Sequence, residues 1–147
     1  MGHLLYQKEL SLFGVLKISS GLINGIIDHA EVHFPIEVCG LISGVDDDVY
    51  EVYRTRNDAN SEVLYQLNPL DYLKADRDAQ TKGFEIIGVY HSHTSSEAFP
   101  SPTDLRLAPD PNWHYLIVSL KMQPPQVRSF RMVDGAIIEE DVLSSIM

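Results

Sequence analysis

The sequence predicts a single α/β domain in which a curved mixed β-sheet is flanked by helices. Segments of β-branched and aromatic residues alternate along the chain with two segments whose apolar residues recur at helical spacing. No repeat, low-complexity tract or Pro/Gly/Ser-rich linker divides the 147 residues, and 44% of them are hydrophobic, enough to bury one core. We therefore expect residues 1–147 to form one domain.

The first half of the chain predicts three strands and one helix. Ser19 or Ser20 can cap the helix, which ends before Pro35. Three adjacent aspartates separate the second and third strands, but they lack the spacing, glycine and glutamate of an EF-hand and indicate a solvated turn. The predicted strands cover residues 12–18, 37–43 and 49–55.

The second half predicts a helix followed by four strands. The helix opens at Asn68, with Pro69 in the first turn where its missing N–H has no cost, and runs towards Gly83. Asp134 and Gly135 form a two-residue hairpin signal between the last two strands. The predicted strands cover residues 84–93, 113–120, 127–133 and 136–139.

The charge and cysteine content exclude several classes of function. With 21 acidic and 11 basic residues the net charge is −10, so we expect no nucleic-acid partner and no attraction to anionic membranes. Cys39 is the single cysteine and cannot form an internal disulfide, which favours a reducing cytoplasm. No signal-peptide pattern and no apolar run of membrane-spanning length are present. We expect a cytoplasmic protein.

Two histidines stand at the end of the strand predicted for residues 84–93. Successive side chains of a strand point to opposite faces, so His91 and His93 project together while Ser92 points away. A catalytic zinc site takes three protein ligands and keeps one position open for water. Asp104, just beyond the following loop, can supply the third ligand as a carboxylate oxygen. The pattern therefore predicts a metal site.

The same segment allows other interpretations. Ser101 and Asp104 stand three residues apart, as do the cap and the acidic residue of a good helix start, so neither needs a further function. His91, His93 and Glu97 match an HxHxxxE pattern of cupin metal sites, but the other glycine and histidine features of cupins are absent. Two histidines and a carboxylate can also bind iron, because ligand identity alone does not fix the metal.

Taken together, the motif residues resemble a known family. The segment HSHTSSEAFPSPTD contains HxH, seven residues, Ser, two residues and Asp, while PIEVCGLISG with Glu37 lies well upstream. This pattern resembles the JAMM (MPN+) motif of zinc metallopeptidases, including its acid-bearing segment ExCGLxxG. The resemblance extends from the first strand and helix to RSFRMVDG and covers most of the chain. It implies the JAMM/MPN fold, which is similar to that of cytidine deaminases.

The resemblance implies a role for each motif residue. His91, His93 and Asp104 would hold one Zn²⁺ per chain together with a water molecule, and zinc lowers the pKa of such a water to about 7. Glu37 would take the proton from that water and pass it to the leaving amine. Ser101 would donate a hydrogen bond to the tetrahedral oxyanion, an effect of roughly 3 kcal/mol in comparable sites.

Within the family, HSHTSSEAFPSPTD and RSFRMVDGAIIEE resemble the bacterial peptidases of the CysO-cysteine type. Those enzymes hydrolyse the amide between cysteine and the C-terminal glycine of a ubiquitin-like sulfur carrier protein, in cysteine biosynthesis. The resemblance thus implies a carrier whose Gly-Gly tail lies along a sheet edge. The alternatives are an isopeptidase that removes ubiquitin-like proteins from conjugates and a non-catalytic MPN scaffold. A homodimer is the expectation from base rates.

The remaining polar and aromatic residues receive no catalytic role. Cys39 lies two residues after Glu37, but a lone cysteine without a clearly placed histidine is expected to be a small buried side chain. Some tyrosines could line the groove for the carrier tail, although core or sheet positions are the simpler expectation. The unassigned residues are His3, His29, His33, His114, Tyr50, Tyr53 and Tyr65.

Overall fold

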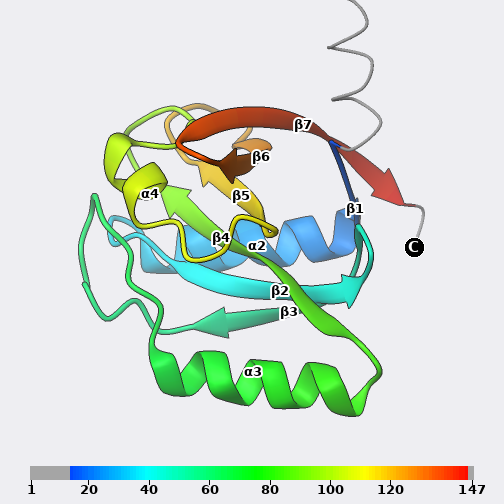
Figure 1. Cartoon of the computed structure of the whole chain (residues 1–147). Coiled ribbons are helices and arrows are strands. Elements are labelled where there is room, and N and C mark those ends of the chain that lie inside the picture. The colour runs from blue at the N-terminus through cyan, green and yellow to red at the C-terminus, as the bar shows by residue number, and fades with distance from the viewer. Residues whose placement is uncertain (1–13, 146–147) are drawn as a thin grey trace, which may run out of the picture.

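The structure, a computed structural model, describes residues 14–145 (Figure 1). Strands and helices alternate along this part of the chain, and no helix within it has the length and apolar character needed to span a membrane. The elements are β1 (Val15–Ser19), α2 (Ser20–His33), β2 (Cys39–Val45), β3 (Asp48–Thr55), α3 (Pro69–Thr81), β4 (Glu85–His93), α4 (Pro102–Arg106), β5 (His114–Ser119), β6 (Gln126–Val133) and β7 (Ala136–Ser145).

The strands form one mixed sheet that closes into a barrel in the order β1-β3-β2-β4-β5-β6-β7. Strand β1 runs parallel to β3 and β7, and β4 runs parallel to β5, while the other neighbours are antiparallel. The contact between β1 and β3 is a single pair, Lys17↔Asp48. The predicted curved mixed sheet is confirmed, and its curvature continues until the two edges meet.

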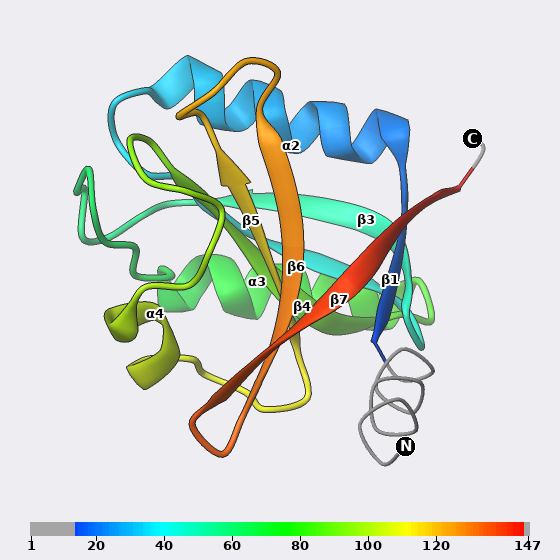
Figure 2. The same cartoon turned by 90° about the horizontal axis from the view of Figure 1, so that it is seen from above.

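Helices α2 and α3 lie on opposite sides of the β2–β3 pair (Figures 1 and 2). Ile26 and Ala30 of α2 are buried in one apolar cluster, whereas Ala75 and Ala79 of α3 are buried in another. Strand β4 contributes side chains to both clusters because its successive residues face opposite sides of the sheet. Both faces of β4 are therefore buried, up to and including its end at His93.

Three local predictions are confirmed. Ser19 caps α2 and Asn68 caps α3, each accepting the N–H of the third residue after it, at 3.2 and 3.0 Å. Pro69 is the first residue of α3. Asp134 and Gly135 turn between β6 and β7 with φ angles of 51° and 77°, the left-handed region that two-residue hairpins require.

The structure differs from the predictions at Glu37 and Asp47. Glu37 was expected inside a strand, but β2 starts at Cys39, because the N–H of Glu37 donates to the carbonyl of Ser61 instead of to a neighbouring strand. Asp47 was expected at a solvated turn, yet its Oδ1 lies 3.0 Å from Nε2 of the buried His114. The start of the predicted strand 12–18 lies outside the described residues.

Candidate active site

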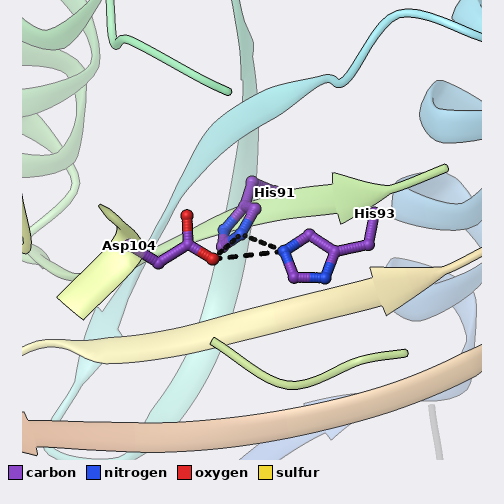
Figure 3. A group of neighbouring side chains, drawn as sticks. All are labelled: His91, His93 and Asp104. Carbon is purple, nitrogen blue, oxygen red and sulfur yellow. Dashed lines mark hydrogen bonds and ion pairs between the residues drawn. The ribbon is translucent and has the colours of Figure 1, made fainter. Parts of the chain in front are cut away.

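Strand β4 ends in the two histidines of the predicted site. His91 and His93 point to the same side of the sheet, and both are buried (Figure 3). Ser92 points the other way, and its Oγ accepts the N–H of Val38 at 2.9 Å. Cys39 at the start of β2 pairs with His91. The alternation predicted from the HxH pattern is confirmed, and neighbouring strands fix both histidines.

Asp104 reaches the histidines from the short helix α4. The Oγ of Ser101 accepts the N–H of Asp104 at 3.0 Å, and Oδ2 of Asp104 accepts the N–H of Ser101 at 2.9 Å. This reciprocal pair is a capping box, as the helix-start interpretation expects. The same Oδ2 lies 3.2 Å from Nε2 of His91 and 3.1 Å from Nε2 of His93. One carboxylate therefore serves the cap and faces both histidines.

The three facing side chains have the spacing of metal ligands. His91 Nε2 and His93 Nε2 lie 3.1 Å apart and complete a triangle with Oδ2 of Asp104. Ligands about 2.0–2.1 Å from a tetrahedral zinc are about 3.3 Å from one another, so the triangle fits zinc with little adjustment. Burial alone would raise the pKa of Asp104, but its contacts with His91 and His93 hold that pKa below its usual value. The donor set is therefore anionic and buried.

The loop after β4 fixes the tautomer of one histidine. Nδ1 of His93 lies 2.7 Å from the carbonyl oxygen of Glu97. Because a carbonyl only accepts, Nδ1 carries the proton, and the lone pair of Nε2 is left free for a metal. The side chain of Glu97 itself is exposed and lies outside the group formed by the other three side chains. The cupin-like HxHxxxE interpretation is therefore wrong.

Glu37 lies directly before β2 and is only 4% exposed. The N–H of Ser92 donates to the carbonyl of Val38, which extends the β2–β4 pairing and brings Glu37 alongside His93. Burial raises the pKa of Glu37 to about 8, with His93 opposing and Asp104 reinforcing the shift. Its Oε1 is buried and has no hydrogen-bond partner among the described residues. Such a carboxyl can accept and return a proton near neutral pH.

Sequence reasoning missed the position of Tyr65. This residue comes from the loop between β3 and α3, and its ring stacks on that of His91 with centroids 4.3 Å apart and planes at 23°. With Leu107 of the segment after α4 it lines a cavity of about 420 Å³ that reaches Asp104. No local pattern predicts the contact, because it joins residues that are distant in sequence.

Cys39 has the structural role expected of it. Its thiol is fully buried, 3.4 Å from Oγ1 of Thr55, and it lies at the start of β2. Burial raises the pKa of Cys39 to about 11, with Thr55 opposing the shift. A thiol with this pKa is protonated at neutral pH and is a poor nucleophile.

The geometry of the site agrees with a comparison to known families. Residues 19–133 match the family described as prokaryotic homologs of the JAB domain. The chain belongs to this family. The JAB assignment confirms the resemblance to JAMM/MPN proteins, and it covers the residues of the site, from Glu37 to Asp104. Together with the buried His-His-Asp group, it identifies the chain as a JAMM-type metallopeptidase.

Individual relatives resemble this chain over different shares of its length. The CysO-cysteine peptidase of Mycobacterium tuberculosis is 37% identical over 131 residues, which cover 87% of this chain and 90% of that protein. The desampylase of Pyrococcus furiosus is 37% identical over 70 residues, or 48% of this chain and 50% of that protein. The solution structure of a protein from Desulfitobacterium hafniense is 32% identical, with a TM-score of 0.83, and covers 90% of this chain and 94% of that one.

Proposed function

We propose that this chain is a zinc-dependent peptidase that releases cysteine from the C-terminal glycine of a ubiquitin-like sulfur carrier protein. The observation that carries the proposal is the buried triangle of His91, His93 and Asp104 beside the unpartnered Oε1 of Glu37. The choice of substrate is supported by the relative named CysO-cysteine peptidase, which matches 87% of this chain. We expect the reaction in the cytoplasm.

His91, His93 and Asp104 would hold one zinc ion per chain. Zinc, when bound, acidifies a coordinated water and polarises the carbonyl of the scissile bond. Two neutral imidazoles and one carboxylate suit zinc, although iron accepts the same donors. The proton on Nδ1 of His93 is fixed by the carbonyl of Glu97, which orients Nε2 towards the metal position. Metal analysis of the purified protein distinguishes zinc from iron.

Glu37 and Ser101 would perform the proton transfer and the oxyanion stabilisation. Oε1 of Glu37 accepts a proton from water and returns it to the amine of the released cysteine, as a carboxyl with a pKa raised by burial can do. Oγ of Ser101 accepts the N–H of Asp104, which leaves its own proton free to be donated to the oxygen of the scissile carbonyl. The capping bond also fixes the direction of that donation.

The carrier tail would occupy the cavity beside Asp104. This cavity is lined mainly by apolar residues of the loop before α3 and of the segment after α4, and Asp104 of the ligand group is part of its wall. A Gly-Gly tail suits a confined approach because glycine carries no side chain. The cavity lining comprises Leu64, Tyr65, Gln66, Leu67, Thr103, Asp104, Leu107 and Pro109.

The test is cleavage of a sulfur carrier that bears a C-terminal cysteine, followed by mass spectrometry. Zinc-loaded wild type should release free cysteine, and Glu37→Gln should retain zinc while its rate falls by about 10²–10⁴-fold. Glu85→Gln is the matched control, because this exposed glutamate begins β4 at the end away from the ligands, and its rate should equal that of wild type. Equal rates for wild type and Glu37→Gln would refute the catalytic proposal and favour a scaffold.

A second candidate function is cleavage of isopeptide-linked conjugates of ubiquitin-like proteins. It is favoured by the similarity to the relative named desampylase, although that similarity spans only 48% of this chain. The same assay distinguishes the two, if a conjugate joined through a lysine side chain is offered beside the cysteine adduct. Cleavage of the conjugate without cleavage of the adduct would move the function to deconjugation.

A further inference from the structure

The connection between β3 and α3 is an ordered loop that folds back on itself. Asn57 and Leu67 form an isolated antiparallel bridge, and the N–H of Asp58 donates to the carbonyl of Gln66 at 2.8 Å. We call residues 57–67 the flanking loop. Its second half lines the cavity beside Asp104, so the loop forms one wall of the substrate approach in the proposed function.

The flanking loop holds both main-chain polar groups of Glu37. The N–H of Glu37 donates to the carbonyl of Ser61 at 2.9 Å, and the carbonyl of Glu37 accepts from Nδ2 of Asn57 at 3.0 Å. Glu37 lies outside β2, and although β4 holds the adjacent Val38 through Ser92, the main-chain N–H and carbonyl of Glu37 itself are bonded by the loop. Its orientation therefore depends on the loop.

Asn57 is the centre of these contacts. Its Nδ2 also donates to the carbonyl of Leu64 at 2.9 Å, and its Oδ1 accepts the N–H groups of Ala59 and Gln66 at 3.0 and 2.8 Å. A carboxamide has two N–H donors and an oxygen with two acceptor positions, and all four are used here. An aspartate at this position could accept but not donate, so it would lose the bond to Glu37.

The flanking loop also contacts the metal-binding strand. Tyr65 stacks on His91, and Oγ1 of Thr94, the residue after His93, donates to the carbonyl of Glu62 at 3.2 Å. The flanking loop thus contacts the main chain of Glu37, the metal-binding end of β4 and the cavity beside Asp104. Of its side chains, only that of Asn57 bonds the main chain of Glu37.

We propose that Asn57 is a positioning residue that joins the main chain of Glu37 to the flanking loop, so that the base and the cavity wall move as one unit. This inference rests on the proposed function, because it assigns to Asn57 an effect on the step that Glu37 performs. Asn57 contacts no reacting atom and acts only through Glu37.

The main test compares Asn57→Asp with Asn60→Asp in the zinc-loaded protein. Both substitutions make the same chemical change in the same loop, but the side chain of Asn60 makes no hydrogen bond to Glu37. Asn57→Asp should lower kcat at least 10-fold, and Asn60→Asp should stay within about 2-fold of wild type. Zinc content should remain one per chain in both variants. A kcat for Asn57→Asp within 2-fold of wild type would overturn the proposal.

A double-mutant cycle separates positioning from general damage to the fold. If Asn57 acts through Glu37, adding Asn57→Asp to Glu37→Gln should change the residual rate by less than about 2-fold. An equal loss of rate in both backgrounds would contradict the inference. Should Asn57→Asp not fold, Asn57→Gln enters the same cycle, because it keeps the amide group but places it one methylene farther away.

Hydrogen exchange gives a readout that is independent of activity. In the metal-free protein the amide of Glu37 should exchange at least 10-fold faster in Asn57→Asp than in Asn60→Asp, since the loop that supplies its acceptor is released. Unchanged exchange at Glu37 would overturn the proposal even if the rate fell. A wild type that cleaves no carrier adduct refutes the proposed function, whereas this exchange comparison still tests the role of Asn57.

Discussion

At Asp104 a single oxygen takes part in three contacts. Oδ2 accepts the N–H of Ser101 and faces the Nε2 atoms of His91 and His93. The capping box therefore sets the direction of the carboxylate before any metal arrives, which lowers the cost of ordering the ligand on binding. The cap of α4 and the proposed metal site therefore share the same carboxylate oxygen.

Substitution of Ser101 separates its two roles. Ser101→Ala should lower kcat by about 10²-fold, or roughly 3 kcal/mol, through loss of the oxyanion donor. It should also lower the free energy of unfolding by about 1 kcal/mol through loss of the cap. Ser19→Ala, which removes the cap of α2 away from the site, should show the stability loss with unchanged kcat. If both variants lost kcat equally, Ser101 would have no catalytic role.

The raised pKa of Glu37 predicts how stability depends on pH in the metal-free protein. Its folded pKa of about 8 exceeds the ordinary value of 4.5, so between these pH values the folded state binds more protons than the unfolded state. Stability should therefore fall as the pH rises through this window. Glu37→Gln should be more stable than wild type at pH 8, by about 1–3 kcal/mol, and the two should converge near pH 4.5. Urea unfolding in EDTA measures this; a difference independent of pH would contradict it.

Among the elements, helix caps and turns could be predicted because their signals are local. Asn68 with Pro69, and Asp134 with Gly135, carry within a few residues all the information that their structures need. The shared direction of His91 and His93 could also be predicted from the sequence, since strand alternation alone places both side chains on one face of the sheet. The stacking of Tyr65 could not be predicted, because it depends on how a long loop packs against a strand.

Two glycines provide a matched test of element packing. A Cβ on Gly40 of β2 would lie 2.1 Å from the ring of Tyr90 and 2.4 Å from the carbonyl oxygen of Tyr53. Gly40→Ala should therefore destabilise the protein by about 3 kcal/mol or more, because buried backbone and ring must shift. Gly25→Ala in α2 meets nothing within 4 Å and should stabilise it by about 0.5–1 kcal/mol. Thermal unfolding measures both; equal melting temperatures would contradict the packing described.

At the scale of the whole molecule, a polar network centred on the buried His114 and Glu140 ties the barrel together away from the proposed metal site. His114 of β5 contacts Oε2 of Glu140 in β7 at 2.5 Å through Nδ1, and Asp47 in the β2–β3 turn through Nε2. Arg131 of β6 contacts both acids. The sequence gives little sign of this network, because its members come from four separate segments and meet only when the barrel closes.

Neighbouring glutamates of β7 test the contribution of this network. Glu140→Ala leaves His114 and Arg131 without their buried partner and should cost about 3–5 kcal/mol of unfolding free energy. Glu139→Ala removes the more exposed pair with Arg128 and should cost less than about 1 kcal/mol. Zinc content should stay at one per chain in both. Chemical denaturation measures the costs; similar values for the two variants would show that the network adds little.

The pairing of β1 with β7 has a consequence for synthesis on the ribosome. The first and last of the described strands lie side by side over five residue pairs, from Val15↔Asp141 to Ser19↔Ser145. While the chain is still being made, β1 has only its single pair to β3. The barrel can therefore close only after residue 145 has left the exit tunnel, so its closure depends on the last of the described strands.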